Sequence, residues 1–381
     1  MEAGRVTSDL SQARPVADAL AGFDFAKLIA SAAKLRPDRP ALGDSTLPGG
    51  LNLTFAQMES AVAHCATLWR DLAMPEDARV LIIAGARVAP VIATLGALRA
   101  GYDVVLAPSH LVAAELAAIA ETTGAIALCG EVADGGIETA EIIFSAAMSS
   151  AKIRYVAMLT DAPVDGALTI DVKALANQQT DASMPTVARK GAILTLTPDG
   201  DVNSHSQHAL MAATVDFIAE ARIGMRQPVV STLSIASLAG FVAGPLAGFM
   251  SGAQAFLHGP FESDAFRELL SATRQANVVV PVAVAQALID AGYTDGPEIG
   301  ALIALTRCEE GERRESVSGL PLQSSSKSIL SLIDIFAFGE QTLVTKRRPG
   351  EASPLIMPST ERSSIKPISF ATLDSRRSGA I

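Results

Sequence analysis

The sequence predicts an α/β fold with two parallel-sheet subdomains covered by helices, and three observations lead to this prediction. In the first half of the chain, short apolar runs alternate with Ala-rich helical segments: strands at 80–83, 104–106 and 126–129, and helices at about 88–100 and 112–122. Continuously apolar strands separated by helices are typical of a parallel sheet buried on both faces. A second alternating block runs from about Ala192 to Val344. The chain of 381 residues, 49% of them hydrophobic and 18% charged, is long enough for two such units.

Helix signals and polar stretches divide the chain further. Residues 54–72 carry apolar side chains at helical spacing, and Thr54 is placed to cap the helix N-terminus. Gly101 and Gly124 stand where helix C-caps are expected. The polar stretch 176–190 resembles a linker. We therefore expect four parts: an N-terminal segment (1–24), a first α/β subdomain (25–185), a second (186–345), and a loosely ordered tail rich in Ser, Pro and Arg (346–381).

A long uncharged segment leaves two interpretations open. Residues 227–261 contain no Asp, Glu, Lys or Arg, and this uncharged segment is long enough to span a membrane. However, the segment is mostly Ala, Gly and Ser, and three prolines interrupt it. It therefore favours a strand, a buried small-residue helix and a second strand at 253–257.

The composition narrows the function classes. A net charge of −10 argues against a nucleic-acid binder, because phosphate binding needs clustered Lys and Arg. Cys65, Cys129 and Cys308 show no metal-ligand spacing and indicate reduced thiols. The first twenty residues lack the apolar core of a signal peptide. We therefore expect a cytoplasmic protein.

Several motifs occur in a fixed order along the two blocks. The first block contains LTFAQM, PEDARVLIIAG, LRAGYDVVLAP and LVAAELAAIAETTGAIAL, and the second contains STLSIASLAGFVAGPLAGFMSGAQAFLHGPF. Their order and spacing resemble the large domain of AMP-forming acyl-CoA synthetases, in the adenylate-forming ligase superfamily, which has a small-residue helix and a strand at the position of the last motif. The resemblance covers roughly residues 25–345. It implies the family's fold, ATP or AMP with Mg²⁺ as cofactors, and a carboxylic acid or acyl-CoA as ligand.

The phosphate loop is where the resemblance is weakest. The family loop reads TSGTTGxPKG, and its glycines, hydroxyls and Lys surround the ATP phosphates. Here only PDGDVNS stands between a strand and His205, and the resemblance assigns Thr197, Gly200 and His205 to cofactor binding. Asp199 and Asp201 occupy the place of the phosphates, and no Lys occurs from 191 to 326. Two carboxylates without a compensating cation repel a triphosphate. We interpret the segment as a degenerate loop, with a working variant and an unrelated turn as alternatives.

Other family positions are matched in part. A family motif that stacks adenine and places a Glu on magnesium corresponds to 336–340, so the resemblance assigns Phe336 and Gly339 to the cofactor, and Glu340 to catalysis and the metal. The family's ribose-binding Asp has no counterpart. The small C-terminal domain that bears the adenylation Lys is expected to be lacking, so a protein partner could supply it.

The acyl site is predicted at the small-residue helix. Gly240, Gly244 and Gly248 recur every fourth residue and leave a groove that suits a hydrocarbon chain, or a close approach of another element. The resulting hypothesis is an acyl-CoA synthetase-like pseudoenzyme that binds a carboxylic acid or acyl group, such as a fatty acid, with impaired or absent turnover. The alternatives are an active ATP-dependent acid–CoA ligase with a divergent loop, and a structural subunit of an enzyme complex.

Overall fold

The computed structural model describes residues 23–44, 50–134, 137–179, 189–308 and 331–348. Its helices are α2 (Phe25–Leu35), α3 (Phe55–Asp71), α4 (Val88–Ala100), α5 (Ala113–Thr123), α6 (Thr139–Ser149), α7 (Val172–Ala176), α8 (Gln207–Ala221), α9 (Leu238–Phe241), the π-helical turn η2 (Val242–Leu246), α10 (Ala247–Ser251), α11 (Ser263–Thr273) and α12 (Val282–Asp290). Its strands are β1 (Pro40–Asp44), β2 (Asn52–Thr54), β3 (Arg79–Ile83), β4 (Asp103–Ala107), β5 (Ala125–Glu131), β6 (Ala133–Asp134), β7 (Ile137–Glu138), β8 (Tyr155–Leu159), β9 (Leu168–Ile170), β10 (Ile193–Leu196), β11 (Val202–His205), β12 (Val229–Ser231), β13 (Ala255–Leu257), β14 (Ala276–Pro281), β15 (Ile299–Cys308), β16 (Ser331–Phe338) and β17 (Thr342–Arg347).

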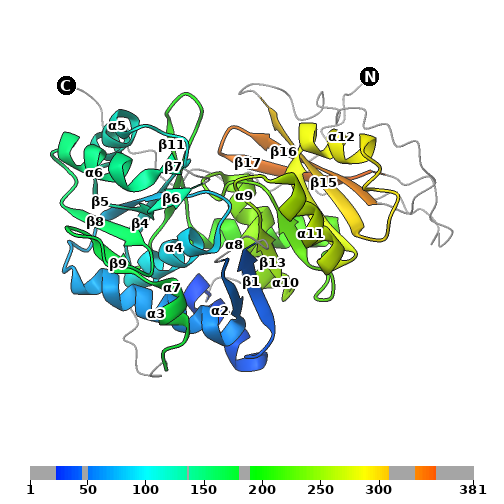
Figure 1. The fold of residues 1–381 in the computed structure, drawn as a ribbon, viewed down its shortest axis with the longest axis horizontal. Helices are drawn as coiled ribbons and strands as arrows, with labels where there is room; N and C mark the ends of the chain where they lie inside the picture. Colours follow the sequence, from blue (N-terminus) through cyan, green and yellow to red (C-terminus); the bar gives the residue numbers. More distant parts are fainter. Residues whose placement is uncertain (1–22, 45–49, 135–136, 180–188, 309–330, 349–381) are drawn as a thin grey trace, which may run out of the picture.

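Two large sheets organise the described residues, and they stand side by side (Figure 1). The seven-stranded sheet has the order β11-β10-β4-β3-β5-β8-β9, and all its pairs are parallel except β10–β11. The eight-stranded sheet has the order β17-β16-β15-β14-β12-β13-β1-β2, with antiparallel pairs only at its two edges. Mixed α/β architecture with parallel-dominated, helix-covered sheets is therefore confirmed.

The local signals in the sequence correspond to observed elements. Thr54 caps α3 in a capping box, because its hydroxyl accepts from the Gln57 N–H and the Gln57 side chain accepts from the Thr54 N–H. Helices α4 and α5 end at Gly101 and Gly124, which have φ angles of 96° and 69°. These left-handed conformations favour glycine.

The chain passes between the two sheets more than once. β1 pairs in parallel with β13, with Leu42 opposite Ala255, and so belongs to the eight-stranded sheet. β10 pairs in parallel with β4, with Ile193 opposite Val104, and so belongs to the seven-stranded sheet. The predicted division between 25–185 and 186–345 remains a prediction about folding units, because each sheet takes strands from both ranges.

The uncharged segment is part of the protein core. It forms β12, then α9, η2 and α10, then β13. The helical part contains Pro245 within η2, where a residue without an N–H interrupts regular hydrogen bonding. Of the helices that the structure describes, none has the length and apolarity needed to cross a bilayer.

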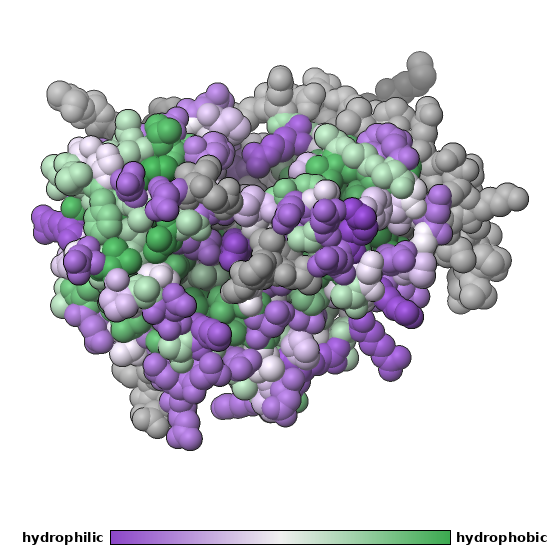
Figure 2. Space-filling model, viewed as in Figure 1, coloured by the Kyte–Doolittle hydropathy of each residue, from purple (hydrophilic) through white to green (hydrophobic). Residues whose placement is uncertain are grey.

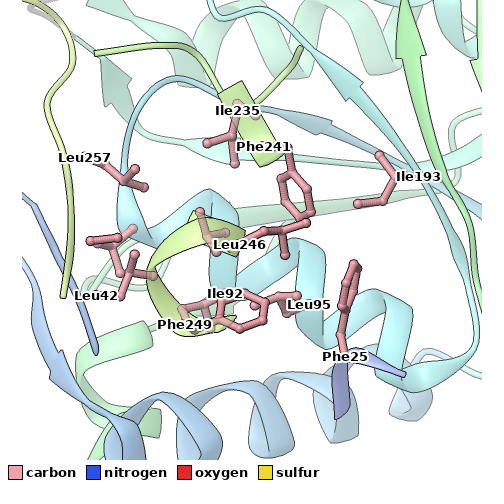
Figure 3. Packing of buried hydrophobic residues seen from close by; sticks show 14 of the residues in the cluster. Phe25, Leu42, Ile92, Leu95, Ile193, Ile235, Phe241, Leu246, Phe249 and Leu257 are labelled. Atoms are coloured by element: carbon pink, nitrogen blue, oxygen red, sulfur yellow. The ribbon is translucent and has the colours of Figure 1, made fainter. Parts of the chain in front are cut away.

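Three hydrophobic clusters are found among the described residues. The largest takes residues from both sheets and includes Phe25, whose ring centroid lies 6.3 Å from that of Phe241 and 6.3 Å from that of Phe249 (Figure 3). A second cluster packs α11 and α12 against the eight-stranded sheet, and a third packs α5 and α6 against the seven-stranded sheet. Cys65, Cys129 and Cys308 are all buried, and none of the three is in a disulfide.

A carboxylate cluster also connects the sheets: Asp44 and Glu131 pair with Arg87, and Asp134 lies near Glu131. Asp44 on β1 accepts the Val88 N–H at 2.8 Å and so caps α4 from the other sheet. The Arg87 guanidinium lies 3.5 Å from Asp44 and 3.9 Å from Glu131. Burial raises the pKa of Glu131 to about 7; Arg87 opposes this effect, while Asp44 and Asp134 add to it.

The basic stretch 346–348, predicted as the start of the loosely ordered tail, is instead ordered. Lys346 and Arg347 belong to β17. Arg348 makes two hydrogen bonds to the buried Asp334 carboxylate, at 2.6 and 2.7 Å. The prediction was wrong because an antiparallel edge strand pairs with β16. The rest of the predicted tail, and residues 1–22, lie outside the described residues.

Candidate functional site

A cleft of about 650 Å³ lies where the carboxyl ends of β4, β10 and β15 meet the turn after β16. One wall is α5, and in the space-filling view apolar side chains gather mainly where α5 and α6 lie (Figure 2). The apolar lining includes Leu111, Ala118, Ile119, Leu196 and Val202. The polar lining includes Ser109, His110, Glu115, Thr197, Ser234, Ser237, Arg307 and Glu340. Crevices at the carboxyl ends of parallel strands are common ligand sites.

Glu340 lies at the buried end of the cleft, in the turn between β16 and β17. Its residue is 3% exposed, and its Oε2 accepts the Leu238 N–H at 2.6 Å. Arg307, at the end of β15, places Nη1 3.7 Å from Oε1. Burial raises the pKa of Glu340, and the Leu238 N–H, Arg307 and the Thr195 hydroxyl oppose that effect.

The segment predicted as a degenerate phosphate loop is a tight hairpin turn. The Thr197 N–H donates to the Asp201 carbonyl at 2.9 Å, and the Gly200 N–H donates to the Thr197 carbonyl at 3.0 Å. The Asp201 N–H donates to the Thr197 hydroxyl at 3.0 Å. Gly200 has a φ of 88°, which suits this turn. Three backbone donors are thus used within the turn instead of pointing at a ligand.

Asp199 and Asp201 do not take the place that the sequence predicted for them. Both are exposed, whereas Thr197, Pro198 and Gly200 line the cleft. We expected both carboxylates to repel a triphosphate at close range. The hairpin turns them toward solvent. The stronger argument against phosphate binding is therefore that the backbone amides of the turn donate within the turn itself.

The other predicted cofactor residues are placed less directly. His205 is 4% exposed and is not among the residues that line the cleft; its Nε2 lies 2.9 Å from the Thr195 Oγ1. Burial lowers the pKa of His205 to about 4. Phe336 is 4% exposed and is not among the residues that line the cleft. Gly339 (φ 53°) forms the turn that precedes Glu340.

The glycines of the predicted acyl site contact other parts of the chain closely. A Cβ built on Gly248 would lie 2.4 Å from the Ala255 Cβ, and one on Gly240 would lie 2.0 Å from the Ser234 carbonyl oxygen. A Cβ built on Gly244 would lie 3.4 Å from its nearest atoms, which belong to Ser231. The contacts at Gly240 and Gly248 match the close-approach alternative. The assignment of these glycines to an acyl site remains a prediction.

Comparisons with known proteins agree with this geometry. A family model described as AMP-binding enzyme matches residues 29–304. The chain belongs to this family. No curated protein sequence matches the chain at a significant level. Members of the AMP-binding family use ATP or AMP and Mg²⁺.

Solved structures share the fold of this AMP-binding family member. The N-terminal domain of FACL13 from Mycobacterium tuberculosis superposes with a TM-score of 0.65 at 16% identity, over 84% of this chain and 79% of that chain. MbtA from Mycobacterium smegmatis gives a TM-score of 0.67 at 17% identity, over 90% of this chain and 62% of that one. A benzoate CoA ligase from Burkholderia xenovorans gives a TM-score of 0.63 at 18% identity, over 83% of this chain and 61% of that one. The chain therefore spans about three fifths of the length of MbtA and of the benzoate CoA ligase.

The residues of this chain fit the family's MgATP poorly. Magnesium sites on nucleotides use one or two carboxylates together with the phosphates. Here Glu340 is engaged by Leu238 and Arg307, and the hairpin amides are used internally. The cleft therefore does not match the cofactor that the family implies.

Arg307 and Thr195 are functional candidates that the sequence reasoning missed. Arg307 follows the apolar run 301–305, so its position at the end of a buried strand was a usable signal. Thr195 lies inside an apolar strand, where a Thr is common in any β-strand and carries no signal of its own.

Proposed function

We propose that this AMP-binding family member binds a carboxylic acid in the cleft and has impaired or absent ligase turnover. The observation that carries the proposal is the closed hairpin turn, in which the Thr197, Gly200 and Asp201 amides donate within the loop. A loop that holds phosphates needs such amides free and a cation nearby. Removing a single electrostatic contact of this kind commonly costs a hundredfold or more in rate.

The chemistry of the cleft supports a carboxylic acid as the ligand. Arg307 provides a guanidinium beside Glu340, and its side chain remains 59% exposed and so accessible to a ligand. Leu111, Ile119 and Val202 provide apolar surface along the same cleft. A guanidinium suits a carboxylate, and the apolar wall suits the rest of an organic acid.

Ligase turnover is tested by pyrophosphate release from purified protein with MgATP, CoA and carboxylic acids from acetate to dodecanoate, together with benzoate. We expect no release above the background of a Glu340→Ala variant. Turnover that persists through further purification and is abolished by Glu340→Ala would refute the proposal.

Acid binding is tested by thermal stabilisation and calorimetry with the same acids. We expect Arg307→Ala to weaken decanoate binding by roughly tenfold or more, because a charge-assisted hydrogen bond is lost. Arg267→Ala is the matched control, since Arg267 on α11 is also 59% exposed and also forms an ion pair, but is not among the cleft-lining residues. Equal effects of the two variants, or no binding of any acid, would contradict this part.

A further inference from the structure

A second cavity, of about 400 Å³, lies at the amino ends of strands in the eight-stranded sheet. Among the residues that line it, Arg39, Pro228 and Gln254 directly precede β1, β12 and β13. These strands run parallel to β15, whose carboxyl end carries Arg307 into the cleft. The cavity and the cleft therefore open at opposite edges of the sheet, and they share no lining residue.

Two arginine side chains line this cavity, although the net charge of the protein is −10. Arg39 is half-buried and donates a hydrogen bond to the Met225 carbonyl, which leaves other donors of its guanidinium for a ligand. Arg226 follows Met225 directly, so the two arginines are neighbours. Arg226 is exposed, and its side chain has no hydrogen bond or ion pair with the part of the chain that the structure describes.

The carboxylate in the lining does not neutralise these two guanidiniums. It belongs to Asp44, which accepts the Leu51 N–H at 3.1 Å and the Val88 N–H at 2.8 Å. Its Oδ1 also lies 3.5 Å from Arg87, which is not among the lining residues. The Asp44 charge is thus engaged by other partners, and the cavity offers two guanidiniums to an anion.

The uncharged lining suits the organic part of a ligand. Asn52 and Gln254 provide amide groups, which can both donate and accept hydrogen bonds. Phe256 on β13 and Leu269 on α11 provide apolar surface. A few polar groups that converge over apolar walls, in a space of this size, are typical of small-molecule sites.

We propose that this cavity binds a small organic phosphate monoester. Near pH 7 a phosphate monoester carries a charge of about −1.5 to −2 on three acceptor oxygens, so two guanidiniums can share it. A carboxylate has one charge and two oxygens, which a single arginine satisfies in bidentate fashion. The surface of Phe256 and Leu269 favours an ester over inorganic phosphate, because an apolar substituent leaves water. The proposal is independent of acid binding in the cleft.

The experiment is calorimetric titration of the full chain with phenyl phosphate and with inorganic phosphate. We expect phenyl phosphate to bind more tightly than inorganic phosphate, with an affinity that falls as the salt concentration rises. Arg226→Ala should weaken phenyl phosphate binding by roughly tenfold or more, because a charge-assisted hydrogen bond is lost. Arg222→Ala is the matched control: Arg222 is also exposed and close in sequence, but is not among the lining residues, so binding should not change.

A second pair of variants introduces a negative charge. Ala272 on α11 is exposed and lines the cavity, whereas its exposed neighbour Ser271 does not. Ala272→Asp should abolish phenyl phosphate binding by repulsion, and Ser271→Asp should largely retain it. No binding of phenyl phosphate at millimolar concentration, or equal losses within either pair of variants, would overturn the proposal.

Arg307→Ala separates the two proposed ligands. It should leave phenyl phosphate binding unchanged, and a loss would place the phosphate in the cleft and overturn the proposal. Benzoate binding should depend on Arg307 and not on Arg226. If benzoate and the other acids do not bind the wild type, the proposed function fails, while the phenyl phosphate titrations still decide whether the second cavity binds phosphate esters.

Discussion

Replacing Glu131 by Gln removes one negative charge from the buried carboxylate cluster, in which Arg87 pairs with Asp44 and Glu131. Asp44, Glu131 and Asp134 come from β1, β5 and β6, and Arg87 precedes α4. The Asp134 Oδ1 is buried and has no hydrogen-bond partner among the described residues. The segments next to the cluster, 45–49 and 135–136, contain no ionisable residues. Burial, with Asp44 and Asp134 nearby, raises the pKa of Glu131 to about 7, so Glu131 takes up a proton near neutral pH.

The magnitude follows from the pKa of Glu131, which burial raises from 4.5 to about 7. A difference of this size between the folded and unfolded states lowers the free energy of unfolding by at most roughly 3 kcal/mol when Glu131 is ionised. Solvent reaches the side chain, which is 15% exposed, so we expect about 1–2 kcal/mol in practice. Because the folded-state pKa is raised, the native state holds a proton that the unfolded chain has released between pH 4.5 and 7. Stability should therefore fall as the pH rises through this range, and the full cost is present above pH 7.

The assay is thermal unfolding of the wild type and Glu131→Gln from pH 4.5 to pH 8. The variant should melt about 2–4 °C higher than the wild type at pH 8, and the difference should vanish toward pH 4.5. Glu76→Gln, at an exposed glutamate, controls for the loss of one charge and should show no such trend. A Glu131→Gln variant that is less stable at pH 8, or whose advantage does not depend on pH, would refute the reasoning.

Three further predictions concern the core and the nucleotide. Thr94→Val should raise the free energy of unfolding by about 1 kcal/mol in urea denaturation, because the buried Thr94 hydroxyl has no hydrogen-bond partner among the described residues; a loss of stability would show an undetected partner. Gly248→Leu should prevent folding, as judged by circular dichroism, whereas Gly244→Leu should fold with reduced stability, since the two Cβ positions lie 2.4 and 3.4 Å from their nearest neighbours; similar behaviour of the two would contradict the packing account. Millimolar MgATP should leave the melting temperature nearly unchanged, and a clear increase that Glu340→Ala abolishes would show that the hairpin opens to bind phosphate.

The sequence predicted the elements well where the signal is local. The capping residue Thr54, the C-cap glycines Gly101 and Gly124, and the apolar strands of the first block all correspond to observed elements. These features depend on hydrogen bonds and backbone angles within a few residues. The resemblance to a ligase family likewise placed Thr197, Gly200 and Glu340, which line one cleft.

Features that depend on distant contacts were not predictable from the same signals. Nothing near Leu42 indicates that its strand pairs with Ala255, and nothing near Ile193 indicates that it joins β4. The orientation of Asp199 and Asp201 depends on how the turn closes, which the residue types alone did not show. Arg307 reaches Glu340 only because β15 and β16 pair in register.

The pairing of β1 with β13 also has a consequence for synthesis on the ribosome. The N-terminal strand cannot take its place until the region around Ala255 has emerged, which requires roughly ten seconds or more at ordinary elongation rates. During that interval the β1–β2 hairpin has an unpaired edge, and α4 lacks the cap that Asp44 supplies. An unpaired strand edge is a template for wrong pairing with other chains. Nascent chains arrested before this point should therefore bind chaperones through the β1 region and release them once β13 is available.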